Sequence, residues 1–263
     1  MKPDYKNWMP KGMVLGALAL AIVFLILAII SGCTPLLTAG TLKTILTILF
    51  VIAALIFWAL TIWTFLLYRA FDYNGKRQMS RQIVEGISSY VNLPAGAKSL
   101  DVGCGSGALA IAVAKRNPQA QVIGIDRWGK EYASFSKNLC EQNAEAEGVS
   151  NTSFGQGDAV HLEFPDETFD AVTSNYVYHN IPSNDRQSIL LETLRTLKKG
   201  GTFALHDIFS TLKYGDMQAF VKKLQDMGYQ KVELIDTTDG MYMKRSEARW
   251  LGLSGSALLT GIK

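Results

Sequence analysis

Two long apolar runs near the start of the chain differ from everything that follows. Met13–Ile30 has no charged or strongly polar side chain over 18 residues, and the 23 residues of Ile45–Leu67 are polar only at threonines and two tryptophan N–H groups. At about 1.5 Å per helical residue, each run is long enough to cross a hydrocarbon core of about 30 Å. The pattern predicts two transmembrane helices, at about residues 12–32 and 45–67.

From residue 98 onward, strand signals alternate with helix signals. This alternation is typical of a parallel sheet with helices on both faces. Strands are predicted at Lys98–Val102, Gln121–Ile125, Thr152–Gln156, Thr168–Ser174, Thr202–His206, Lys231–Ile235 and Ser256–Ile262. Helices are predicted between them at Gly107–Arg116, Lys130–Glu147, Asp185–Leu197 and Met217–Met227. Such folds bind ligands beyond the carboxyl ends of the strands.

The two patterns divide the chain into three parts. Residues 1–70 are predicted to be a membrane anchor, and residues 98–263 an α/β domain. Residues 71–97 are predicted to be a linker whose amphipathic helix starts near Ser80 and ends before Pro94.

The positive charge of the chain belongs to the predicted anchor. Residues 1–70 hold five basic side chains and one acidic side chain, whereas the remaining residues hold 21 basic and 22 acidic ones. A domain without a basic surplus lacks the electrostatic attraction that draws proteins to phosphate backbones. Nucleic acid is therefore not an expected partner. The lipid bilayer is an expected partner because of the two predicted transmembrane helices.

Basic residues also predict the orientation of the anchor. They flank the outer ends of both runs: Lys2, Lys6 and Lys11 before the first, and Arg69, Lys76, Arg77 and Arg81 after the second. The intervening loop carries only Lys43, so the positive-inside rule places both termini and the α/β domain in the cytoplasm. A cleaved signal peptide is the alternative for the first run, because Ile30–Cys33 resembles a lipoprotein cleavage site.

The three cysteines, Cys33, Cys104 and Cys140, are widely scattered. None has the spacing of a zinc site, and three cannot form a disulfide framework. We therefore expect no metal and a reducing compartment for the α/β domain.

The segment Asp101–Gly107 has the pattern of a strand end, a glycine turn and a helix start. Its three glycines allow a sharp turn and a close approach of a ligand to the backbone, and the helix start offers free N–H groups. The spacing Gly103-x-Gly105-x-x-Ala108, with Asp126 23 residues after Gly103, also satisfies the looser dinucleotide fingerprint. The loop alone leaves a nicotinamide cofactor possible.

The surrounding residues resemble class I S-adenosylmethionine-dependent methyltransferases. The resemblance comprises Asp101-x-Gly103-x-Gly105-x-Gly107, Gly124–Asp126, Gly157–Ala159, Phe164–Val172, Ser174–Asn175, Leu194–Gly201 and Ala257–Lys263. It covers about 165 residues and departs from the family at Lys199, where proline is usual. It implies a seven-stranded Rossmann-like sheet with an antiparallel last strand, and S-adenosylmethionine as the methyl donor. The two apolar runs lie outside the common core of the family.

The resemblance further implies a set of donor-binding residues. Asp126 would accept from the ribose hydroxyls, Asp158 would meet the adenine amino group, and Asp101 could hold the ammonium, since charged acceptors form strong hydrogen bonds. For each carboxylate a helix cap or a turn is the structural alternative. The expected donor set is Asp101, Gly103, Cys104, Gly105, Gly107, Asp126, Arg127, Gly157, Asp158, Ala159 and Asn175.

His179 and Tyr176, which follow the fourth predicted strand, are the candidate catalytic residues. An imidazole exchanges a proton near neutral pH, and a tyrosine ring can attract a sulfonium through its face. A loop hydrogen bond for His179 and simple packing for Tyr176 are the alternatives. His206–Asp207 ends the fifth strand on the same rim and could line the pocket.

The sequence predicts methyl transfer to a small molecule. Two membrane helices beside the domain favour a lipophilic acceptor, such as a lipid, a quinone-like ring or a xenobiotic. Two alternatives are a soluble acceptor with the helices as a tether, and a catalytically silent module that binds the donor. The sequence gives no prediction of oligomeric state.

Overall fold

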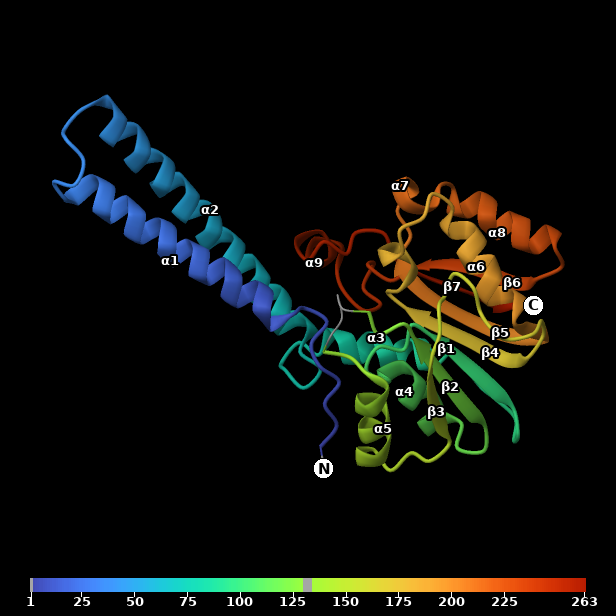
Figure 1. The fold of residues 1–263 in the computed structure, drawn as a ribbon. Coiled ribbons are helices and arrows are strands. Elements are labelled where there is room, and N and C mark those ends of the chain that lie inside the picture. The colour runs from blue at the N-terminus through green and yellow to red at the C-terminus, as the bar shows by residue number, and fades with distance from the viewer. Residues whose placement is uncertain (1, 130–133) are drawn as a thin grey trace. The chain divides into compact units, whose positions relative to one another are not determined.

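The computed structural model describes residues 2–129 and 134–263, and these form two compact units (Figure 1). Residues 7–80 make up one unit, and residues 1–6 together with 81–263 make up the other. The start of the helix predicted from Lys130 lies outside the described residues.

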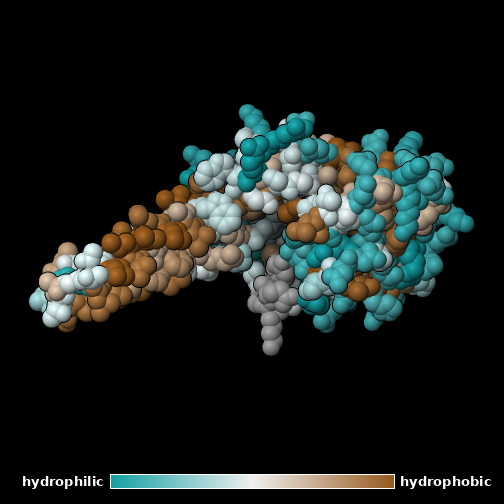
Figure 2. Space-filling model, turned by 90° about the horizontal axis from the view of Figure 1, so that it is seen from above, coloured by the Kyte–Doolittle hydropathy of each residue, from teal (hydrophilic) through white to brown (hydrophobic). Residues whose placement is uncertain are grey.

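The first unit is a hairpin of two helices, α1 (Lys11–Cys33) and α2 (Thr41–Phe71). Phe24 stacks on Phe57 with ring centroids 5.4 Å apart, and Thr47 Oγ1 donates to Ser31 Oγ at 3.1 Å. Most of the large apolar side chains of both helices are exposed, and Figure 2 shows the hairpin covered by apolar surface. By length and composition both helices could cross a membrane, a property that signal sequences and some core helices share.

The second unit is built on a seven-stranded sheet. Its strands are β1 (Lys98–Val102), β2 (Gln121–Asp126), β3 (Thr152–Gln156), β4 (Phe169–Asn175), β5 (Leu197–Ile208), β6 (Gln230–Asp236) and β7 (Ser256–Ile262). They lie in the order β3-β2-β1-β4-β5-β7-β6, and β7 runs antiparallel to both of its neighbours. The predicted seven-stranded sheet with an antiparallel last strand is confirmed.

Helices cover both faces of the sheet. Figure 1 shows α4 and α5 on one side and α6 and α8 on the other. The helices of this part are α3 (Met79–Ser88), α4 (Ala108–Arg116), α5 (Lys137–Ala146), α6 (Arg186–Arg195), α7 (Thr211–Tyr214), α8 (Met217–Asp226) and α9 (Arg245–Trp250), with one 3₁₀ turn, η2 (Tyr178–Asn180). The sequence did not predict η2, α7 or α9, because each is too short to show a helical period.

Two of the predicted boundaries that differ from the structure have an identifiable physical cause. Helix α5 starts at Lys137, after Ser136 caps it by accepting from Leu139 N at 3.2 Å. Helix α6 ends at Arg195, two residues early, and β5 begins at Leu197 rather than at Thr202. Strand β5 begins early because Leu197 pairs with Phe169 of β4. Gly200 N also donates to Lys263 O at 2.6 Å, and Lys263 N donates to Gly201 O at 2.9 Å, so the glycines bond to the end of β7.

The strand register brings four carboxyl ends to one edge of the sheet. Val102 of β1 lies opposite both Ile125 of β2 and Ser174 of β4. Asn175 at the end of β4 lies opposite His206 of β5. The glycine loop, Asp126 and the residues after β4 and β5 therefore share one rim.

Candidate active site

The glycine loop after β1 needs its glycines for two different reasons. Gly103, Gly105 and Gly107 all have left-handed backbone, with φ of +73°, +56° and +82°. A Cβ on Gly103 would lie 2.3 Å from Val177, whereas one on Gly105 would meet nothing closer than Phe135 at 3.6 Å. Gly103 therefore allows close packing of the chain, whereas at Gly105 a Cβ would only reach ordinary contact distance and the left-handed backbone is what favours glycine.

Asp126 holds this loop from the end of β2. Its Oδ2 accepts from Gly105 N at 2.9 Å, and its Oδ1 accepts from Trp128 N at 2.7 Å. Trp128 in turn donates from Nε1 to Gly105 O at 2.9 Å and has a φ of +45°, which is uncommon for a bulky residue. Asp126 and Trp128 thus form one hydrogen-bonded unit with the loop.

Helix α5 also contacts this loop. Cys140 Sγ lies 3.2 Å from Gly105 O, and Asn143 Nδ2 donates to Ser106 O at 2.9 Å. Cys104 within the loop is buried, which raises the pKa of its thiol well above the usual value, as does its hydrogen bond with Cys140. The thiol of Cys104 therefore stays protonated at neutral pH.

Asp101 lies at the base of the loop and is 2% exposed. It accepts a hydrogen bond from Thr173 Oγ1 at 2.9 Å. Burial raises the pKa of Asp101 to about 7, against the opposing effect of the Thr173 hydrogen bond. A nearby cation would favour its charged form.

The turn after β3 is hydrogen-bonded to the end of β2, because Gly157 N donates to Asp126 O at 3.1 Å. Asp158 in this turn is exposed, and its Oδ1 accepts from Val160 N at 2.9 Å. Ala159 is half-buried and Arg127 is exposed. The structure thus brings the turn of the expected donor set against Asp126.

His179 and Asp207 form a close pair across the ends of β4 and β5. The Nδ1 of His179 lies 2.5 Å from Asp207 Oδ1, and the backbone N of His179 donates to Asp207 Oδ2 at 3.2 Å. Asp207 is fully buried, whereas the His179 side chain is 15% exposed. A carboxylate can only accept, so a neutral His179 carries its proton on Nδ1 and keeps the lone pair on Nε2.

Tyr176 lies in a cluster of polar and aromatic side chains beside this pair. Its hydroxyl is 2.8 Å from Ser256 Oγ, and burial raises its pKa. Its ring packs edge-on against His206 at 4.6 Å and lies 5.9 Å from the ring of His179. Its φ of +56° is a second instance of uncommon backbone at this rim.

His206 is a buried neutral histidine. Burial lowers its pKa to about 3, and its ring nitrogens lie 2.8 Å from Asn175 Oδ1 and 3.0 Å from Thr237 Oγ1. Both nitrogens are therefore occupied by protein groups. Of the two histidines at this rim, His179 is the one with an accessible side chain.

Arg186 fastens the loop that carries His179. Its guanidinium donates to four backbone carbonyls, those of Tyr178, Ile181, Ser183 and Lys213. Lys213 in turn donates from Nζ to His179 O at 3.0 Å. The position of His179 is thus fixed on its backbone side as well as through its ring.

Sequence reasoning missed Trp128 and Asn143 and did not connect Asp207 with His179. One signal for the last pair was present, since Asp207 lies near the end of the strand that neighbours the strand before His179. Trp128 and Asn143 carried no signal, because the contacts of Trp128 depend on how the ends of β1 and β2 meet and those of Asn143 on how α5 packs against the loop.

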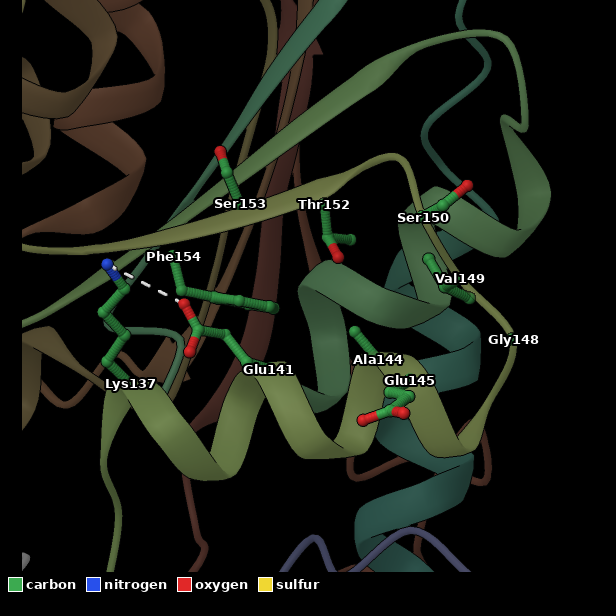
Figure 3. A pocket seen from close by; sticks show the side chains of 10 residues that line it. All are labelled: Lys137, Glu141, Ala144, Glu145, Gly148, Val149, Ser150, Thr152, Ser153 and Phe154. Carbon is green, nitrogen blue, oxygen red and sulfur yellow. Dashed lines mark ion pairs between the residues drawn. The ribbon is translucent and has the colours of Figure 1, made fainter. Parts of the chain in front are cut away.

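A separate cavity of about 560 Å³ lies between α5 and the edge strand β3 (Figure 3). Lys137 and Glu141 lie at one end of it, with Lys137 Nζ 3.7 Å from Glu141 Oε1. None of the predicted site residues lines this cavity. Within residues 2–129 and 134–263, no group of three or more His, Cys, Asp or Glu side chains could hold a metal ion.

Comparison with known proteins identifies the class. Residues 93–247, more than half of the chain, match the family model described as "Methyltransferase domain". The chain therefore belongs to this methyltransferase domain family. The match favours the methyl-donor interpretation of the glycine loop over the dinucleotide one.

The match to a curated relative points to a more specific enzyme than the family model does, but it covers a smaller part of the chain. Over 121 residues the chain is 36% identical to the demethylmenaquinone methyltransferase of Geobacillus kaustophilus (strain HTA426). The aligned segment makes up 44% of this chain and 47% of the relative. The chain thus spans about half the length of the curated relatives it matches.

Two solved structures show the same fold. A geranyl diphosphate methyltransferase in complex with GPP and sinefungin aligns with a TM-score of 0.54 and 12% identity, covering 73% of this chain and 82% of that one. The cyclase SpnF aligns with a TM-score of 0.52 and 21% identity, covering 73% and 84%. At these identities the likeness concerns the fold alone.

Proposed function

We propose that this chain is a membrane-anchored methyltransferase that transfers a methyl group from S-adenosylmethionine to a small lipophilic acceptor with a quinone-like ring. The observation that carries the proposal is the position of two elements on one rim: the glycine loop held by Asp126, and the His179–Asp207 pair. Membership of the methyltransferase domain family supports the reaction. The names of the curated relatives support the acceptor.

The residues around the loop fit the methyl donor. Asp126 offers carboxylate acceptors for ribose hydroxyls, Asp158 offers one for an amino group, and the charged form of Asp101 complements an ammonium. The sulfonium, when bound, supplies an activated methyl group. The other members of the proposed donor site are Gly103, Cys104, Gly105, Gly107, Arg127, Gly157, Ala159 and Asn175.

His179 is the proposed general base. With Nδ1 bonded to Asp207, its Nε2 can take a proton from a ring hydroxyl of a reduced quinone. The ring carbon made electron-rich in this way attacks the methyl carbon, the sulfur keeps the electron pair of the broken C–S bond, and the ring C–H proton then leaves. Alignment of the two reactants by the rim supplies the rest of the acceleration.

Tyr176 is proposed to act through its ring. Its hydroxyl is bonded to Ser256, and its raised pKa makes it a poor source of a catalytic base at neutral pH. The ring packs between His206 and His179, where its face or edge can contact a bound aromatic acceptor.

Membrane attachment is the second part of the proposal. Residues 1–70 would be the anchor, 71–97 the linker and 98–263 the catalytic domain, with both termini in the cytoplasm. The outward-facing apolar side chains of α1 and α2 and the flanking basic residues support this arrangement. A lipid bilayer would then bring a membrane-dissolved acceptor to the domain.

Two other functions are tested by the same experiment. The acceptor could be soluble, with the helices as a tether. The chain could also bind the donor without transferring its methyl group, because the fold alone is shared with a cyclase.

The test incubates the full-length protein with methyl-labelled S-adenosylmethionine and a membrane extract, and follows the label by mass spectrometry. Label in a lipid-phase product supports the proposal, label in an aqueous product supports the soluble acceptor, and no product supports the silent module. Asp126→Ala is the control for donor-dependent labelling.

A further inference from the structure

The first residues of the chain dock on α5, although they precede the two apolar helices. The backbone N of Asp4 donates to Asn143 Oδ1 at 2.7 Å, and Asp4 O accepts from Asn143 Nδ2 at 3.1 Å. Tyr5 is 4% exposed, and its hydroxyl donates to Glu147 at 3.2 Å. Lys6 pairs with the Asp4 carboxylate. We call Asp4–Lys6 the strap, and Figure 1 shows the N-terminal segment beside α5.

One side chain joins the strap to the glycine loop. The amide nitrogen of Asn143 donates to Asp4 O and also to Ser106 O, the latter at 2.9 Å. Asn143 is 2% exposed, and its oxygen and both of its N–H groups have partners. Without the strap, a buried N–H and a buried oxygen would lose those partners, which favours a rearrangement of the amide.

The bond from Asn143 to Ser106 acts on the part of the loop that begins α4. A peptide group is planar, so holding the carbonyl of Ser106 also fixes the direction of the N–H of Gly107. Gly107 is the N-cap of α4, with a φ of +82°. Cys140, one turn before Asn143 on the same face of α5, contacts the neighbouring carbonyl of Gly105. Helix α5 therefore holds two successive peptide groups of the loop.

We propose that the strap positions the donor-binding loop through Asn143, so that donor affinity depends on a segment located before the first apolar helix. Asn143 is a positioning residue, since it touches the loop and the strap. Only residues 7–10 separate the strap from α1, so the anchor and the donor loop are connected through a short length of chain. The proposal rests on the proposed role of the loop in donor binding.

The test uses the full-length protein in detergent with three variants. Tyr5→Ala removes a buried contact of the strap. Asp4→Pro removes the backbone N–H that donates to Asn143 Oδ1, and Asn143→Ala removes the side chain that joins the strap to the loop. Glu141→Ala is the matched control, because Glu141 is an exposed residue of the same helix whose ion-pair partner is Lys137.

Two measurements are made on each protein: hydrogen exchange of residues 103–109 without donor, and calorimetric affinity for sinefungin. We expect the three variants to exchange faster in the loop and to bind about fivefold more weakly, the effect of one lost hydrogen bond. The control should match the wild type. Combining Tyr5→Ala with Asn143→Ala should weaken binding no further than Asn143→Ala alone, because both act through one path.

The outcomes separate this proposal from the proposed function. If the wild type fails to bind sinefungin, the donor site is wrong, and hydrogen exchange still decides whether the strap orders the loop. If the wild type binds and the strap variants unfold at lower temperature with unchanged affinity and loop exchange, the strap is only a stabilising contact and the proposal is overturned. Tyr5→Ala and Asp4→Pro leave Asn143 intact, so the test survives a failure of Asn143→Ala to fold.

Discussion

Asp207 Oδ1 lies 2.5 Å from His179 Nδ1, with the carboxylate buried and the imidazole partly exposed. This contact fixes both the ring orientation and the nitrogen that carries the proton. Replacing the carboxylate by an amide leaves the volume unchanged and allows the ring to adopt the other tautomer.

Asp207→Asn should therefore lower kcat by about a hundredfold or more, the usual contribution of a positioned base, with little change in donor affinity. Steady-state kinetics and donor calorimetry on the same sample check this. The matched substitution Asp236→Asn, on a partly exposed carboxylate at the end of β6, should keep the wild-type rate. A wild-type rate for both Asp207→Asn and His179→Ala would remove the pair from the chemistry.

Asp101 should make the protein less stable as the pH rises. Its pKa is about 7 in the folded protein, against an ordinary value of 3.8 for an aspartate in an unfolded chain, so between these pH values the folded state binds the proton more tightly. The free energy of unfolding then falls as the pH rises from about 4 to about 7, by up to about 4 kcal/mol from this group.

Asp101→Asn keeps the acceptor for Thr173 and cannot ionise. Its unfolding temperature should exceed that of the wild type increasingly from pH 4 to pH 8, while its affinity for the donor falls because the ammonium loses its counter-charge. Thermal unfolding at several pH values and calorimetry measure the two effects. A constant difference in stability across this range would show that Asp101 does not titrate as described.

Gly103→Ala should destabilise the protein more than Gly96→Ala. Both glycines have left-handed backbone, with φ of +73° and +77°, but a Cβ would meet Val177 at 2.3 Å in the first case and nothing within 4 Å in the second. The backbone alone costs about 1 to 2 kcal/mol, and the clash adds to it. Denaturant unfolding compares them, and Val177→Ala should rescue part of the loss only for Gly103→Ala. Equal losses in the free energy of unfolding for the two variants would mean that the loop accommodates a Cβ next to Val177 without strain.

Cys33 offers a direct test of membrane topology. It is exposed at the end of α1, whereas Cys104 and Cys140 are buried in the other unit. In intact cells a membrane-impermeant maleimide should label the protein once, and Cys33→Ser should abolish the labelling. Labelling of Cys33 only after permeabilisation would place the hairpin loop on the cytoplasmic side and contradict the predicted orientation.

The sheet could be predicted from the sequence because its signals are local. Most strands carry apolar residues and lie near glycine, proline or charge, and the resemblance around Asp101, Asp126 and Asp158 placed three strand ends in order. The start of β5 was predicted wrongly because Lys199–Gly201 looks like a turn, whereas Leu197 already pairs with Phe169 of β4 and the glycines bond to Lys263.

The site was predictable as a set of strand ends and unpredictable as a set of contacts. The position of His179 after β4 follows from chain order, but its partner Asp207 lies on another strand and depends on register. The strap is a clearer case, since nothing in the sequence pattern links Asp4 with Asn143 across two apolar helices.

The most direct test of the central claim uses purified full-length protein in lipid vesicles that contain a reduced quinone with an unsubstituted ring position. Methyl-labelled S-adenosylmethionine is added, and the lipid phase is analysed by mass spectrometry. We predict a quinone that has gained one labelled methyl group, formed by the wild type and not by Asp126→Ala or His179→Ala. Bound donor with no labelled quinone would contradict the assignment of this site as a methyltransferase acting on a quinone-like ring.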